Sequence, residues 1–201
     1  MSRDSSPGST LAHIRGRTRE LHERAEALID LPTLRTVERY RTLLSLLLGF
    51  HAPLERRLAH VDLHAVGLDL DARLKAHLLE DDLRCLGVEP RQVPACSDLP
   101  ALPALPEALG CLYVLEGSTL GGQVISRHLR ETMGIVPGEG GSFFASDGRD
   151  VGAMWRAFCR ALAAGCPGEP EAVRAAESAV RTFSSFNHWL AAAPTFSSAS
   201  T

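Results

Sequence analysis

One histidine has charged neighbours at helical spacing. His22 lies in the segment IRGRTRELHERAEALI, at the edge of an apolar face and one residue after Leu21. Glu26 follows it at i+4, where a carboxylate can orient a ring nitrogen or a bound water. Arg15 and Arg19 precede it by seven and three positions, roughly on the same side of the helix. A lone histidine there is more often structural or exposed, and it is these neighbours that indicate a ligand.

A neutral imidazole flanked by cations suits a planar dianion such as haem, whose iron is commonly held by one proximal histidine. The other histidines are weaker candidates. His51 and His77 lie within helical segments without a partner pattern, and His128 follows a glycine cluster, where we expect the rim of a pocket. Histidines in polar surroundings are predicted to be solvated: His13, His60, His64 and His188. No HExxH motif or GxSxG elbow is present in the sequence.

The glycine cluster lies in the apolar helical segment LGCLYVLEGSTLGGQVISRHL. Each interior glycine costs about 1 kcal/mol relative to alanine. Gly117 and Gly121 are four residues apart and therefore face the same way. They serve either close helix packing or a flat ligand that lies against bare backbone. The full GxxxGG run ends at Gly122 and encloses Ser118 and Thr119, which is more than packing requires. No strand precedes it and no GK[ST] follows, which argues against a phosphate loop.

These residues require helices, and the apolar period is helical nearly throughout. The first helix is expected to be capped by Ser9 or Thr10 and to run to Ile29. The third is expected to end at Gly87, a natural C-cap. We expect the remaining elements as follows: helices over 36–59, 70–86, 107–133, 151–164 and 170–193, a proline-rich connection over 88–106 and a glycine-rich loop over 134–141.

The fold class predicted by this pattern is all-α, a single-domain bundle of roughly six to eight helices. Residues 10–193 form the domain, and residues 1–9 and 194–201 are expected to be flexible. The five cysteines are scattered without a CxxC pair, so we expect free thiols. Cys111 and Cys159 are expected to behave as small buried hydrophobes.

Composition and charge argue against some classes of partner. The chain has 201 residues and a formal net charge of -3, with no basic run, which argues against a nucleic-acid partner. No apolar stretch approaches the ~18 residues of a transmembrane helix, so we expect no membrane partner. The first ten residues carry no apolar signal region, and the expected location is the cytoplasm.

The two motifs together resemble the haem oxygenase family. The helix carrying TRELHERAE resembles that family's proximal helix, with His22 on the axial ligand of the haem iron. EGSTLGGQ resembles its distal helix, with Gly117 and Gly121 on the glycines that lie over the haem. The resemblance runs from about Leu11 to Leu190 and implies the haem-oxygenase-like helical bundle. The EGSTLGG form most resembles bacterial enzymes encoded beside bacteriophytochromes.

The resemblance also implies haem contacts outside the two motifs. Arg15 and Arg19 correspond to proximal cations near the haem edge, and Arg156 and Arg160 to cations that contact the propionates. Further haem-binding residues are expected at three positions: Glu26, Gly122 and Phe183. Phe183 and its neighbour Phe186 either close the pocket or belong to the core. Ser118 stands where many animal members carry an aspartate that orders distal water, which leaves proton delivery open.

The implied reaction consumes haem, dioxygen and electrons, and yields biliverdin, carbon monoxide and ferrous iron. Haem is both cofactor and substrate, while Gly117, Ser118 and Gly121 shape the oxygen side. The implied partners are a reductase or ferredoxin-type electron donor and a bacteriophytochrome that accepts biliverdin. Two alternatives stay open: a non-catalytic haem-binding or haem-transfer protein of the same fold, and an all-α interaction module without haem, in which the glycines only pack helices.

Overall fold

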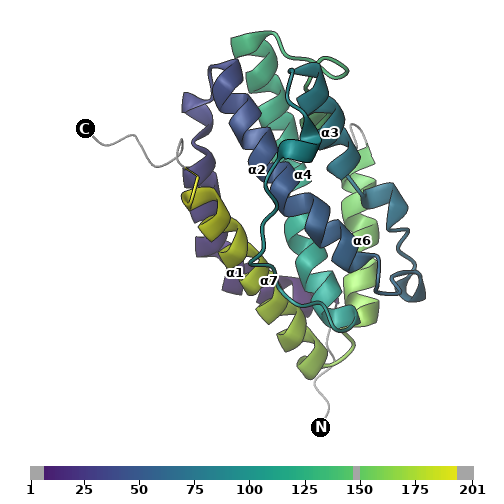
Figure 1. Cartoon of the computed structure of the whole chain (residues 1–201). Helices are drawn as coiled ribbons and strands as arrows, with labels where there is room; N and C mark the ends of the chain where they lie inside the picture. The colour runs from purple at the N-terminus through teal and green to yellow at the C-terminus, as the bar shows by residue number, and fades with distance from the viewer. Residues whose placement is uncertain (1–6, 147–149, 194–201) are drawn as a thin grey trace.

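The described part of the protein consists of helices joined by 3-10 turns and loops. A computed structural model describes the backbone of residues 7–146 and 150–193, and all their side chains except those of 7–9 and 118–120. Within these ranges there is no strand, which confirms the all-α prediction. The described helices are α1 (Pro7–Ile29), α2 (Val37–Leu58), α3 (Ala76–Cys85), α4 (Leu105–Met133), α5 (Ser142–Ala145), α6 (Val151–Gly165) and α7 (Glu169–Ala191), with short 3-10 turns between them (Figure 1).

The starts of α1 and α3 differ most from the sequence prediction. Helix α1 begins at Pro7, so the expected cap at Ser9 or Thr10 is wrong. Proline is favoured in the first helical turn because its fixed φ suits the helix and its missing N–H has no partner there anyway. Helix α3 begins at Ala76 instead of residue 70, after a 3-10 turn at Asp71–Arg73.

The start of α3 is set by a residue distant in sequence. The Glu55 carboxylate of α2 accepts hydrogen bonds from the backbone N–H groups of Lys75, at 2.8 Å, and Ala76, at 3.0 Å. It thereby satisfies donors that a helix N-terminus leaves unpaired. The predicted end is confirmed, since Gly87 follows the helix with a φ of 78°.

Helix α7 is the centre of the packing. It lies beside α1 and also packs against α4 (Figure 1). Gly110 of α4 permits the second contact, because a Cβ there would collide with the carbonyl oxygen of Ala175. Two clusters of buried apolar side chains result. One contains Phe50 and Phe183, the other contains Leu47 and Phe143, and Phe186 packs against both.

The glycine-rich loop over 134–141 is held from both sides. The Tyr40 hydroxyl donates to the carbonyl oxygen of Gly140 at 2.8 Å. Burial raises the pKa of Tyr40, and the nearby Asp82 carboxylate raises it further. The two Asp82 oxygens accept from the backbone N–H groups of Ser142 and Phe143, both at 2.8 Å. This loop and α5 are thus fixed against α2 and α3.

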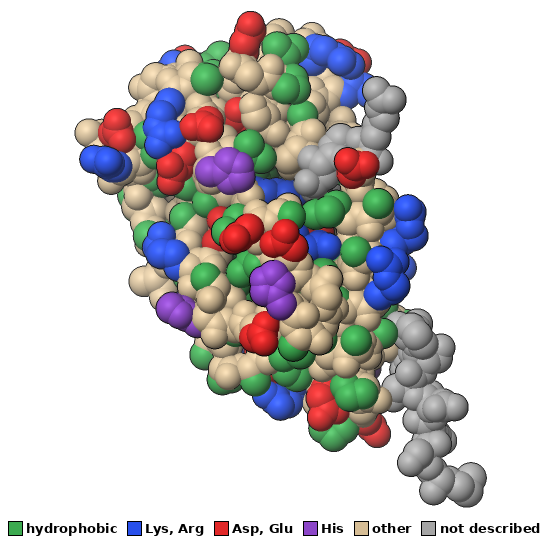
Figure 2. Space-filling view, turned by 90° about the vertical axis from the view of Figure 1, so that its right-hand side faces the viewer, with side chains coloured by type: hydrophobic (Ala, Val, Ile, Leu, Met, Phe, Trp, Pro, Cys, Tyr) green, Lys and Arg blue, Asp and Glu red, His purple; other side chains and the backbone are tan. Residues whose placement is uncertain are grey.

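The described surface is mixed in character. Figure 2 shows a face on which acidic, basic and apolar side chains are interspersed. Val124 is the one large apolar side chain that is strongly exposed among the described residues. None of the described helices is both long enough and apolar enough to cross a bilayer.

Candidate active site

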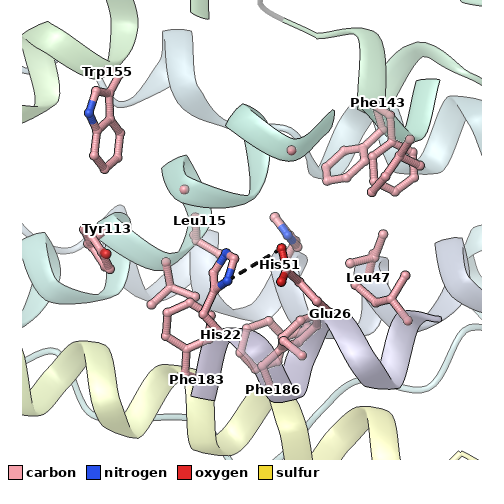
Figure 3. A pocket seen from close by; sticks show the side chains of 18 of the residues that line it. His22, Glu26, Leu47, His51, Tyr113, Leu115, Phe143, Trp155, Phe183 and Phe186 are labelled. Atoms are coloured by element: carbon pink, nitrogen blue, oxygen red, sulfur yellow. Dashed lines mark ion pairs between the residues drawn. The ribbon is translucent and has the colours of Figure 1, made fainter. Parts of the chain in front are cut away.

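A cavity of about 440 Å³ lies where the two apolar clusters meet. Its size falls within the roughly 300–1,000 Å³ typical of small-molecule sites. In Figure 3, Trp155 of α6 and Phe143 of α5 stand at different ends of the cavity, with α7 aromatics below. The lining residues are Arg15, His22, Ala25, Glu26, Ile29, Leu47, Phe50, His51, Tyr113, Val114, Leu115, Gly117, Gly121, Ile125, Phe143, Phe144, Trp155, Phe183 and Phe186.

His22 reaches the cavity from α1. Its Nδ1 lies 3.7 Å from Oε1 of Glu26, and the side chains are 51% and 69% exposed (Figure 3). The ring meets Phe183 of α7 edge-on, with centroids 5.8 Å apart. Buried Asn187 of α7 donates to the carbonyl oxygen of Leu21 at 3.0 Å, which fixes α1 beside the histidine. Because Nδ1 faces Glu26, Nε2 is the nitrogen available to a ligand.

Helix α4 forms the wall across from α1 and uses its glycines in two ways. At Gly117 and Gly121, a Cβ would meet no atom of the described residues within 4 Å. Both glycines line the cavity, so they do not serve helix packing, as one reading of the sequence had it. Gly122 does, because a Cβ there would lie 2.7 Å from the carbonyl oxygen of Phe144. It is buried and absent from the cavity lining, in contrast to the expected haem contact.

A buried ion pair holds α4 immediately before Gly117. Nη1 of Arg73 lies 2.6 Å from Oε1 of Glu116, and both side chains are buried. Nη2 of Arg73 also donates to the carbonyl oxygen of Met154 on α6, at 3.4 Å. Arg73 therefore joins the two helices that carry Gly117 and Trp155. Breaking such a pair by removing one partner strands a buried charge and costs about 3–5 kcal/mol.

The four candidate arginines are not equivalent. Arg15 lines the cavity. Burial raises the pKa of the Cys159 thiol on α6, and the Arg15 cation opposes this, so Arg15 lies near α6 as well. Arg19 is 76% exposed and pairs with Glu23 at 4.0 Å. Arg156 and Arg160 are exposed on α6 and do not line the cavity.

Sequence reasoning missed His51. It is 4% exposed and lines the cavity from α2, and its Nδ1 lies 3.9 Å from Oε1 of Glu55. The expectation that it has no partner pattern is wrong, because Glu55 stands at i+4, as Glu26 does to His22. The expected pocket-rim histidine, His128, instead contacts the carbonyl oxygen of Leu34 at 2.8 Å and does not line the cavity.

Other residues also differ from, or extend, the sequence prediction. Phe183 and Phe186 both line the cavity. Phe183 also belongs to the buried core and Phe186 packs against it, so closing the pocket and packing in the core are not exclusive roles here. Tyr113 and Trp155 add an aromatic contact, with ring centroids 6.0 Å apart. The Ser118 side chain lies outside the described residues. All five cysteines are free, as expected; Cys111 is buried and Cys159 is half-buried.

The cavity is largely apolar and aromatic, with an imidazole on one helix and bare backbone on another. This arrangement defines a helical protein with an apolar ligand cavity between two helices. Comparison with known proteins names the class: the family model for heme oxygenase matches residues 9–192. The chain belongs to the haem oxygenase family and is a haem-degrading oxidoreductase. Haem is its substrate and cofactor, used with dioxygen and a reductant.

A solved structure agrees with this fold. The NO- and CO-bound heme oxygenase from Neisseria meningitidis has a TM-score of 0.79 and 24% identity. The alignment covers 95% of this chain and 94% of that one. No match was found among curated protein sequences.

Proposed function

We propose that this enzyme binds haem in the cavity between α1 and α4, with Nε2 of His22 as axial ligand of the iron. The observation that carries the proposal is that His22 and the open faces of Gly117 and Gly121 line one cavity. A single imidazole leaves the opposite side of the haem free. The products are biliverdin, carbon monoxide and ferrous iron.

The residues present fit haem. Glu26 lies 3.7 Å from Nδ1 of His22, where its carboxylate can orient the imidazole ring. Phe183 supports the other side of the ring at 5.8 Å. Arg15 supplies a cation at the edge of the cavity for a propionate, while the aromatic lining excludes water from the macrocycle. Arg19, Arg156 and Arg160 do not line the cavity, and we assign them a long-range attraction at most.

The bare backbone at Gly117 and Gly121 provides room above the ring. A side chain there would occupy space that is now empty. When haem is held by His22, this open space beside Gly117 and Gly121 would admit dioxygen to the macrocycle. The macrocycle and its iron supply the oxidation chemistry, and the protein supplies orientation, dryness and access.

The test is a titration followed by turnover. Hemin is added to the apo protein, and the Soret band is recorded; a chemical reductant is then added in air. Decay of the Soret band into biliverdin absorbance supports the proposal. A stable Soret band under the same conditions refutes ring opening and indicates a haem carrier. Hemin bound to serum albumin is the control for background haem oxidation.

We propose further that the biliverdin serves a bacteriophytochrome, in the cytoplasm, with electrons from a reductase or ferredoxin-type donor. The support is the motif EGSTLGG at residues 116–122, which resembles the form found in phytochrome-associated enzymes. Coexpression with an apo-bacteriophytochrome in a host that makes no biliverdin tests the idea. A red-absorbing holophytochrome is expected with the wild-type enzyme and none with His22→Ala. Free biliverdin without a loaded phytochrome would contradict the proposal.

A further inference from the structure

Helix α5 forms one end of the cavity. Phe143 and Phe144 line the cavity there, whereas Trp155 of α6 stands at a different end (Figure 3). Arg15 is the one arginine or lysine among the described residues that line the cavity, and its effect on the Cys159 thiol places it near α6. A flat ligand with its negative charges on one edge is therefore expected to turn that edge toward α6 and its apolar edge toward α5.

The bond from His22 to the iron cannot by itself fix the orientation of the macrocycle. A single bond at the centre of a disc leaves the disc free to rotate in its own plane. The rotation angle decides which carbon at the rim lies beside Gly117 and Gly121, whose bare backbone offers no side chain to stop the rotation. Contacts at the rim must therefore set the angle, and the end walls of the cavity supply them.

The wall formed by α5 is bulky and closely packed. Phe143 and Phe144 are 6% and 7% exposed, and their rings meet edge-on with centroids 5.0 Å apart. The carbonyl oxygen of Phe144 lies against Gly122 of α4, where a Cβ would approach it to 2.7 Å. The wall is therefore backed by the helix that carries the open glycines, and it cannot shift toward that helix without a clash.

The position of this wall depends on Asp82 of α3. Helix α5 has four residues, too few to be stable alone. Asp82 is 1% exposed, and its carboxylate accepts hydrogen bonds at 2.8 Å from the N–H groups of Ser142 and Phe143, one to each oxygen. The backbone of α5 is thereby held in both position and direction. A second, uncharged hold is the Tyr40 hydroxyl, which donates to the carbonyl oxygen of Gly140.

The chemistry of Asp82 indicates a role beyond filling space. Burying a carboxylate costs stability unless hydrogen bonds compensate for the lost water, whereas an apolar side chain fills such a space without that cost. Hydrogen bonds to a charged acceptor are stronger than neutral ones and depend on geometry. Both bonds of Asp82 end on the segment that carries Phe143 and Phe144. A carboxylate here is therefore suited to fixing the wall in one place.

We propose that Asp82 is a positioning residue that sets which carbon of the macrocycle is oxidised, because it holds Phe143 and Phe144 as the stop against rotation of the ring. Asp82 does not line the cavity, so it acts through α5. The inference rests on the proposed function, since it takes haem as the ligand and His22 as its axial residue. It places a determinant of regiochemistry outside the helices α1 and α4, and we expect one predominant biliverdin isomer from the wild type.

The test compares Asp82→Ala with a variant at a second buried carboxylate. Biliverdin from each haem-loaded protein is separated into its isomers by chromatography. In Asp82→Ala the ratio of the main isomer to the others should fall roughly tenfold, the equivalent of one charge-assisted hydrogen bond. Glu107→Ala is the matched control, because Glu107 is 6% exposed and pairs with Arg174 at 2.7 Å, yet lies roughly 22 Å before Gly122 along α4. It should lose stability and keep the wild-type isomer ratio.

Two measurements without turnover accompany the product analysis. Hydrogen exchange of the Ser142 and Phe143 amides in the apo protein reports whether α5 is held, and it should be faster in Asp82→Ala only. Proton NMR of the cyanide complex of ferric haem resolves the haem methyl signals of each ring orientation. One predominant set is expected for the wild type and Glu107→Ala, and a second set should gain intensity in Asp82→Ala.

Milder changes keep the test decisive if Asp82→Ala fails to fold. Asp82→Asn keeps one oxygen as an acceptor for α5, and Tyr40→Phe removes only the hydroxyl that holds Gly140. Both should change the isomer ratio in the same direction as Asp82→Ala, but by less. An unchanged ratio in every folded, haem-loaded variant at these two positions overturns the proposal, as does an equal change in Glu107→Ala.

The outcomes also separate this inference from the proposed function. If the wild type forms no biliverdin, or His22→Ala keeps a histidine-ligated spectrum, the proposed function fails. If the wild type forms biliverdin through His22 and the isomer ratio ignores Asp82, only the present inference fails. An unselective isomer mixture from the wild type contradicts the present inference in the same way.

Discussion

Gly121 is the position where the packing role and the ligand role of the α4 glycines differ most. A Cβ at Gly121 meets no described atom within 4 Å, whereas one at Gly110 collides with the Ala175 carbonyl oxygen. Both glycines lie in the same helix, so both suffer the same intrinsic penalty of about 0.5–1 kcal/mol relative to alanine. Alanine at each position therefore isolates the effect of the surroundings.

Alanine at Gly121 and alanine at Gly110 should change the free energy of unfolding in opposite directions. Gly121→Ala should stabilise the apo protein by about 0.5–1 kcal/mol, because it gains helix propensity and meets no clash. For a protein of this size, that corresponds to a rise in Tm of roughly 1–4 °C. Gly110→Ala should destabilise it by about 1–3 kcal/mol or more, since backbone must move away from backbone.

A side chain at Gly121 should stabilise the apo protein but interfere with activity once haem is bound. Gly121→Val should still fold and bind haem through His22, yet it fills the space above the ring and should abolish most biliverdin formation. Thermal melts of the three apo variants, hemin titrations and biliverdin yields make up the assay. If Gly121→Ala lowers Tm as Gly110→Ala does, Gly121 is a packing residue. Wild-type biliverdin yield from a folded, haem-loaded Gly121→Val protein would refute the site.

Three other outcomes follow from the structure. His22→Ala should lose its histidine-ligated ferric spectrum and most turnover, with partial recovery on added imidazole; an unchanged spectrum would reject the ligand. Arg15→Ala should weaken haem affinity by about 1 kcal/mol, and more than the double variant Arg156→Ala and Arg160→Ala, because Arg15 lines the cavity and the other two do not; equal losses in hemin titrations would contradict this. Burial raises the pKa of the Cys111 thiol to about 12. The folded state therefore keeps the proton that the unfolded state releases above a pKa near 8.5. The stability that the buried thiol contributes is complete below that pH and is lost as pH rises toward 12. Between pH 8 and pH 10.5, the free energy of unfolding measured with urea should fall by roughly 2–3 kcal/mol less in Cys111→Ala than in wild type. Equal falls in both proteins would show that the Cys111 thiol does not cause this pH dependence.

Local periodicity predicted most of the fold. The end of α1 at Ile29, the extent of α2 and the passage of α4 through its glycines all depend on residues close in sequence. The start of α3 could not be predicted in this way. It is set by Glu55, twenty residues earlier, which caps Lys75 and Ala76 from another helix.

Contacts between residues distant in sequence also limited what could be predicted about the site. Spacing placed Gly117 and Gly121 on one face of the helix, but only the contact with the Phe144 carbonyl oxygen shows that Gly122 serves packing. His51 could have been noticed in the sequence from the apolar residues around it and from Glu55 at i+4. Its burial against the cavity is seen only in the structure. Arg73 gave no signal, because its partners Glu116 and Met154 are far away in sequence.

The contact between His22 and Phe183 has a consequence for the timing of synthesis. The ribosome adds about 5–20 residues per second, so Phe183 emerges on the order of ten to thirty seconds after His22. During that interval the histidine lacks the aromatic ring that supports it and the Asn187 amide that holds α1. A nascent chain therefore cannot offer a finished pocket until α7 has been synthesised.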